Sequence, residues 1–149
     1  MPNEKRKKIG VDFKAKIEGE ITKELMLPAP DTSNHFLGLA ETKGRNKCLE
    51  GSTFLDGAVV GSVESWDLLE GAGPDRGYMT FTVGGDTVVV RYSGRAKPDG
   101  SEKYLLSGRI SFLSGSGRFL GINGRASYTG WASSNKYELT WQGRYTLPG

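Results

Sequence analysis

The chain has 149 residues, a formal net charge of +3 and 22 glycines, and its length favours one domain with a buried core. The glycines stand singly or in pairs without a strict period. This spacing excludes collagen and flexible linkers and favours an all-β protein with many turns. The single cysteine excludes an intramolecular disulfide scaffold.

The excess positive charge lies at the N-terminus, where four of the 20 basic residues fall between Lys5 and Lys8. We interpret residues 1–11 as a disordered basic tail and residues 12–149 as a single, nearly neutral domain. Nucleic acid is therefore not the partner that we expect. The chain has no apolar run of about 20 residues and no signal-peptide pattern, so we expect a cytoplasmic protein that does not associate with membranes.

A long first strand is predicted over residues 13–27, where apolar and polar residues alternate with a period of two. A helix is the alternative, because Glu and Lys are good helix formers, but the β-branched residues and Gly19 favour a strand. Pro28 and Pro30 end it. One face of this strand is expected to hold Ile17, Gly19, Ile21, Lys23 and Leu25.

Seven further strands are predicted, over residues 35–43, 58–69, 78–83, 87–96, 103–113, 125–132 and 137–147. Residues 71–77 (GAGPDRG), 84–86 and 97–100 carry the residue types of tight turns. Eight strands joined mostly by short connections predict a closed antiparallel barrel, because closure removes the exposed edges. The interior of such a barrel is either packed by side chains or holds one small ligand.

A glycine-rich stretch, residues 108–130, links two of these strands. Its glycines allow positive φ angles and close backbone approach, and we expect one short helical turn around residues 118–120. Phe119 and Leu120 are expected to plug that end of the barrel.

The run Gly115-Ser116-Gly117-Arg118-Phe119, with Gly121 and Gly124 after it, resembles the signature of the allene oxide cyclase and dirigent-protein β-barrel superfamily. The resemblance implies an eight-stranded antiparallel barrel with an axial cavity, and membership among the many bacterial proteins that carry the same pattern. Characterised members steer the cyclisation or coupling of small hydrophobic molecules, and several are dimers or trimers. We therefore expect a homo-dimer or homo-trimer.

Common catalytic and cofactor motifs are absent from the sequence. One histidine and one cysteine cannot form a zinc site of the usual Cys/His type, and no G-x-S-x-G elbow or phosphate-binding loop is present. We therefore predict neither a metal nor a cofactor. His35 is expected to be a solvated surface residue, and Cys48 to lie in a polar loop.

Glu64 is the candidate catalytic residue, because it shares a strand face with Val60, Trp66 and Leu68. If this face points inward, burial raises the pKa of the carboxyl and fits it for proton transfer. The alternatives are a structural ion pair with an arginine, or an outward-facing strand. Arg91 and Arg109 are expected on solvated faces, although an inward arginine could hold an anionic group.

Trp66, Tyr92, Tyr104 and Trp141 are the candidate ligand-binding residues, although core packing explains such aromatic positions equally well. The leading hypothesis is a barrel that binds a small, largely apolar molecule in its lumen, and that acts as a cofactor-free cyclase or isomerase by positioning it. The alternative is a non-catalytic carrier, or an oligomeric structural barrel with a filled interior. The residues do not decide whether the protein is an enzyme.

Overall fold

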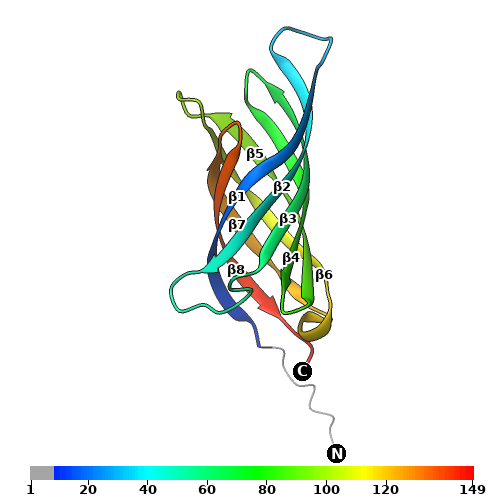
Figure 1. Cartoon of the computed structure of the whole chain (residues 1–149), viewed down its shortest axis with the longest axis vertical. Coiled ribbons are helices and arrows are strands. Elements are labelled where there is room, and N and C mark those ends of the chain that lie inside the picture. Colours follow the sequence, from blue (N-terminus) through cyan, green and yellow to red (C-terminus); the bar gives the residue numbers. More distant parts are fainter. Residues whose placement is uncertain (1–8) are drawn as a thin grey trace, which may run out of the picture.

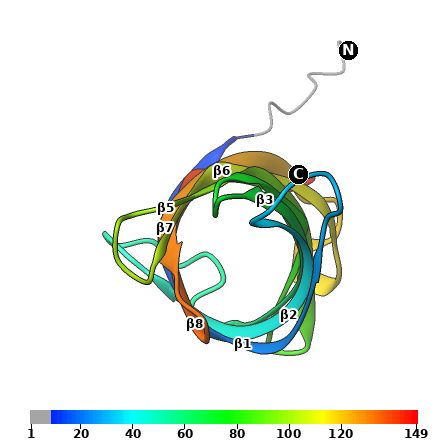
Figure 2. The same cartoon turned by 90° about the horizontal axis from the view of Figure 1, so that it is seen from above.

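The computed structural model describes residues 9–149 as an all-β closed barrel (Figure 1). Each strand pairs antiparallel with its neighbours in sequence, and the first pairs with the last. Figure 2 shows the resulting ring of strands. The predicted fold class is confirmed. The elements are β1 (Val11–Pro28), β2 (His35–Cys48), β3 (Val59–Leu69), β4 (Gly73–Val83), β5 (Asp86–Pro98), β6 (Tyr104–Gly115), η1 (Gly117–Phe119), β7 (Asn123–Ala132) and β8 (Lys136–Thr146).

β4 and β2 extend furthest beyond the ranges that the sequence predicted. β4 begins at Gly73, so most of the GAGPDRG segment is strand and only residues around 70–72 form the turn. The reason is tertiary pairing, because Asp75 stands in register between Trp66 of β3 and Gly94 of β5. β2 continues to Cys48, where it still pairs with β1. Cys48 therefore ends a strand instead of lying in a loop.

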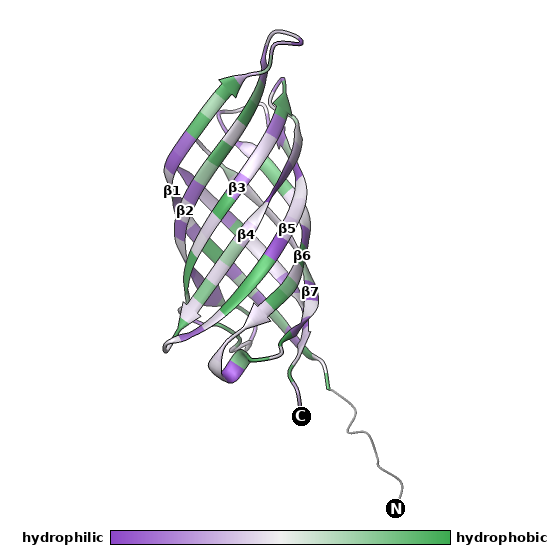
Figure 3. Ribbon diagram, turned by 90° about the vertical axis from the view of Figure 1, so that its right-hand side faces the viewer, coloured by the Kyte–Doolittle hydropathy of each residue, from purple (hydrophilic) through white to green (hydrophobic). Residues whose placement is uncertain are grey.

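A β-bulge between Ile21 and Lys23 reverses the faces of β1. Residues up to Ile21 follow the predicted alternation, but the extra residue turns Lys23 and Leu25 outward. The prediction that these two residues share a face with Ile17, Gly19 and Ile21 is therefore wrong. Beyond the bulge, Glu24 and Met26 line the interior of the barrel instead. Figure 3 shows the alternation of hydrophilic and hydrophobic residues along the strands.

The lower half of the barrel, where β1 begins and the C-terminus lies in Figure 1, is filled with side chains. The loop between β2 and β3 turns inward and buries Phe54 and Leu55. Phe54 stacks on Tyr145 with ring centroids 4.1 Å apart, and Phe13 lies edge-on to Trp141 at 4.7 Å. Such aromatic contacts stabilise a core beyond the area that they bury.

The short helix η1 contributes one side chain to the filled lower half of the barrel. Phe119 is buried against the aromatic cluster, as predicted, whereas Leu120 is 70% exposed. The prediction for Leu120 is wrong because η1 ends at Phe119, after which the chain turns away at Gly121 with a positive φ. Asn46 pairs with two polar groups in this filled half. Its side chain accepts a hydrogen bond from Trp141 Nε1 and donates one to the carbonyl of Leu55, each at 2.9 Å.

The hairpin between β1 and β2 extends beyond the other connections at the upper end (Figure 1). His35 fixes its base. The imidazole Nδ1 lies 2.6 Å from a carboxylate oxygen of Asp31, and Nε2 contacts the carboxylate of Asp67 on β3. The side chain is 16% exposed, so it is not the solvated histidine that the sequence predicted. These hydrogen bonds, first that of Asp67 and then that of Asp31, raise the pKa of His35.

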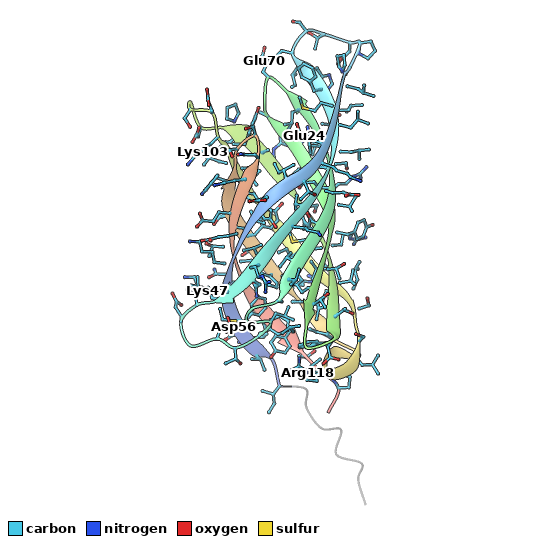
Figure 4. The ribbon with its side chains drawn as sticks, viewed as in Figure 1. Glu24, Lys47, Asp56, Glu70, Lys103 and Arg118 are labelled. Carbon is cyan, nitrogen blue, oxygen red and sulfur yellow. The ribbon has the colours of Figure 1, made fainter. Side chains whose placement is uncertain are left out.

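We expect His35 to titrate above the ordinary imidazole pKa of about 6.5. Because the folded pKa is raised, the contact favours the folded hairpin at low pH and weakens as pH rises through the folded pKa. An NMR titration of the imidazole protons measures the midpoint. Asp67→Asn should lower it, whereas Glu70→Gln, at the same end of the barrel (Figure 4), should not. A wild-type midpoint at or below the ordinary value contradicts the prediction.

Candidate functional site

The upper half of the barrel holds a cavity of about 990 Å³ that opens at the end opposite the chain termini. We call this cavity the funnel. Figure 4 shows Glu24 and Lys103, two of its lining residues, near this end. At its base lies a smaller inner chamber of about 30 Å³. The two spaces share five lining residues and are therefore adjacent. The shared residues are Ile21, Glu64, Asp75, Leu106 and Ala132.

Glu64 lies where the funnel meets the inner chamber. β3 places it on the inner face of the barrel with Trp66, which is one of the arrangements that the sequence left open. Its Oε2 accepts a hydrogen bond of 2.7 Å from the hydroxyl of Tyr92 on β5. Burial raises the pKa of Glu64 despite this hydrogen bond, and the negative charge of Asp75 raises it further.

Asp75 is the site residue that sequence analysis missed. It lies on β4, is 7% exposed, and its Oδ1 accepts a long hydrogen bond of 3.5 Å from the Tyr128 hydroxyl. Burial raises the pKa of Asp75 to about 6. The sequence did hold a signal, because the inward alternation of β4 runs from Met79 through Gly77 to Asp75. The turn-like residues Gly73 and Pro74 obscured it.

Two tyrosines hold the two carboxyls. The rings of Tyr92 and Tyr128 meet at right angles with centroids 5.8 Å apart. Burial, followed by the nearby carboxylates, raises the pKa of both phenols, so both keep their protons and serve as hydrogen-bond donors. Two neighbouring acids, each with its own tyrosine donor, therefore face one cavity.

The inner chamber carries further hydroxyl groups. Thr42 and Ser62, on neighbouring strands, hydrogen-bond to each other through their side chains. The hydroxyl of Tyr137 on β8 also belongs to this chamber, and the residue is only 7% exposed. Within residues 9–149 this hydroxyl makes no well-formed hydrogen bond, although the nearby Thr42 side chain partly offsets the rise that burial causes in its pKa. A buried polar atom without a partner is unusual in folded proteins.

Inward-facing glycines make room for the tyrosine rings. A Cβ added at Gly77 would lie 2.7 Å from the Tyr92 hydroxyl, and one at Gly94 would lie 2.4 Å from that of Tyr128. Tyr137 lies in the same way across Gly19 of β1. The rings therefore lie against the barrel wall, and the space above them stays open.

The remaining predicted residues are divided between the two halves of the barrel. Trp66 and Tyr104 line the funnel, whereas Trp141 lies in the filled half, stacked on Phe81 at 4.9 Å. The structure therefore places Trp141 in the core and outside the cavity. Arg91 and Arg109 are exposed, as predicted.

Metal-ligating residues do not gather anywhere in the described chain: no group of three His, Cys, Asp or Glu side chains among residues 9–149 could hold a metal ion. The same residues contain no helix that is both long and apolar enough to cross a membrane.

Comparison with known proteins relates the fold to dirigent proteins. No protein-family model matches the chain, and no curated protein matches its sequence. The pterocarpan synthase dirigent protein GePTS1 is similar in structure, with a TM-score of 0.55 and 10% identity over 95% of this chain and 90% of that one. The pterocarpan synthase dirigent protein PsPTS1 matches with a TM-score of 0.49 and 11% identity over 97% of both chains. The likeness to GePTS1 places this chain in the same eight-stranded barrel fold.

Proposed function

We propose that the protein binds a small, largely apolar molecule in the funnel and promotes a cofactor-free cyclisation or isomerisation of it. One observation carries the proposal: a buried carboxyl with a raised pKa, Glu64, lies at the base of an open cavity walled by aromatic and aliphatic side chains. The fold that the chain shares with a pterocarpan synthase dirigent protein supports a positioning role.

Proton transfer in this site needs two groups in different protonation states. The scheme assigns the proton to one of the two carboxyls, Glu64 or Asp75, and the negative charge to the other. Burial raises the pKa of both groups, that of Asp75 to about 6, and the charge of Asp75 raises that of Glu64 further. The ionised carboxylate takes a proton from the bound molecule, and the protonated carboxyl gives one back at another atom. The molecule is then rearranged with no net change of protons. The rigid wall supplies the remaining catalysis by holding one folded conformation of the substrate.

Native mass spectrometry of the purified protein tests whether the funnel is a binding site. We expect a stoichiometric small molecule that is released on gentle activation. Ala132→Trp, which fills the junction between funnel and chamber, should abolish its binding. Thr129→Trp, at an exposed position of the same strand, should not. A bound molecule that survives Ala132→Trp, or a wild-type protein that takes up no apolar compound, would contradict the proposal.

Glu64→Gln then separates an enzyme from a carrier. The amide still accepts a hydrogen bond from Tyr92 but carries no transferable acid proton. We expect this variant to retain the released molecule and to lose its conversion by about 100-fold or more, the usual scale of general acid–base catalysis. If the wild-type protein binds but never converts the molecule, the carrier function is correct.

Homo-oligomer formation remains a prediction of the family resemblance, and the same mass measurement tests it. The outer face of β1 and β2 exposes a group of leucines that such an assembly would cover. These are Leu25, Leu27, Leu37 and Leu39.

A further inference from the structure

The funnel has an uneven distribution of charge. Four acids line it or its base: Glu24, Glu64, Asp75 and Glu102. The only basic residue in the described lining is Lys103. The Lys103 ammonium does not pair with the acids that line the funnel. It lies instead 4.2 Å from the ring centroid of Trp131, which is not a lining residue of the funnel. In the described chain, no salt bridge reaches Glu64 or Asp75.

The unpartnered hydroxyl of Tyr137 is an independent sign of a missing polar group at the same place. It belongs to the inner chamber that Glu64 and Asp75 also line, and it is buried without a hydrogen bond in the described structure. A polar atom left in this state costs free energy unless a ligand or water satisfies it. The chamber volume of about 30 Å³ has room for one or two water-sized groups.

An ammonium group matches both observations. It is about the size of a water molecule, and it has three N–H donors for the carboxyl and hydroxyl oxygens that line the chamber. Its charge compensates the buried acids, which lack a cation of the protein. Trp66 and Tyr104 line the funnel above it and suit the apolar body of such a molecule. An anionic ligand would meet only repulsion here.

We propose that the molecule bound in the funnel is an apolar amine, whose protonated nitrogen enters the inner chamber between Glu64 and Asp75 while its apolar body fills the funnel. This inference rests on the proposed binding function and specifies the substrate class. It identifies Tyr137 as a ligand-binding residue that the proton-transfer scheme does not use.

Three probes of one shape and different charge test the inference: naphthylethylamine, naphthylethanol and naphthylacetate. Titration calorimetry at about pH 7.5 should give an affinity for the amine at least about tenfold above that for the alcohol, because hydrogen bonds to charged groups are the stronger ones. The acetate should not bind measurably. Equal binding of the alcohol and the amine overturns the inference and leaves the proposed function standing. If none of the probes binds, both are overturned.

Substitutions of the chamber residues test whether a preference for the amine arises in the inner chamber. Glu64→Gln and Asp75→Asn should each reduce it about tenfold while changing alcohol binding little. Tyr137→Phe removes a hydroxyl that makes no well-formed hydrogen bond in the described structure, so the variant should fold and still weaken amine binding. Glu20→Gln, on the exposed outer face of β1, is the matched control. An amine preference unaffected by all three chamber variants would overturn the inference.

Discussion

Between about pH 3 and pH 8 the unfolding free energy of the wild-type protein should fall by about 3 kcal/mol relative to that of Asp75→Asn. The cause is the burial of Asp75, which raises its pKa from the ordinary 3.8 to about 6 in the folded barrel. A difference of this size corresponds to about 3 kcal/mol. Because the folded state holds the proton more tightly than the unfolded state, its stability is lost as pH rises between the two pKa values and is constant above them.

Denaturant unfolding of both proteins across this pH range measures the difference. The comparison cancels the exposed carboxyls whose pKa is lowered by partners, such as Asp12 beside Arg144, because they contribute equally to both proteins. It reports Asp75 together with its effect on Glu64, whose pKa the charge of Asp75 raises. At high pH the asparagine variant should be the more stable, since its amide still accepts from Tyr128 without a buried charge. Parallel pH profiles for the two proteins would show that Asp75 is solvated and would remove it from the site.

The same experiment connects stability with function. An ionised Asp75 without a cation costs free energy in the empty protein, and a bound ammonium would return part of that free energy. A ligand that stabilises the wild-type barrel more at high pH than at low pH would therefore carry positive charge. Natural proteins retain such destabilising groups where they serve binding or catalysis.

The periodicity of the sequence was sufficient to predict the barrel and the shared strand face of Glu64 and Trp66, but not that this face points inward. It failed where a non-local contact overrode a local signal. Asp75 follows a glycine and a proline that favour a turn, yet pairing with β3 and β5 holds the segment as strand. The amino-acid types around the bulge in β1 do not indicate it, although the bulge determines whether Leu25 points into or out of the barrel.

The division of the lumen into a filled and an open half could not be predicted either. The filling comes from a loop that inserts Phe54 and Leu55 between strands far away in the sequence. No property of that loop in isolation indicates which barrel end it enters. Trp141 was assigned to the ligand site for this reason: it faces inward, as expected, but into the filled half.

Gly94→Ala should destabilise the barrel by more than about 3 kcal/mol, lowering the melting temperature by roughly 10 °C or preventing folding. A methyl group at Gly94 would lie 2.0 Å from the carbonyl oxygen of Ser107 and 2.8 Å from the Cα of Gly108. Both are backbone atoms of the paired strand and cannot move aside without breaking the β5–β6 ladder. Two facing glycines thus let these strands pack closely under the ring of Tyr128.

Gly61→Ala is the matched control in the same sheet. The nearest atom to its added methyl group is the carbonyl oxygen of Thr42 at 3.9 Å, so we expect unchanged stability or a gain of up to about 1 kcal/mol from the stiffer unfolded chain. Gly38→Ala tests a clash with a side-chain ring instead of with backbone, since the three atoms nearest to the added methyl group all belong to the Trp66 ring, the nearest at 2.1 Å. That ring can swing into the funnel, so this variant should fold with a cost of about 1 kcal/mol and lose ligand binding. If Gly94→Ala were as stable as Gly61→Ala, the close packing of β5 and β6 would not be what keeps Tyr128 against the wall and the cavity open.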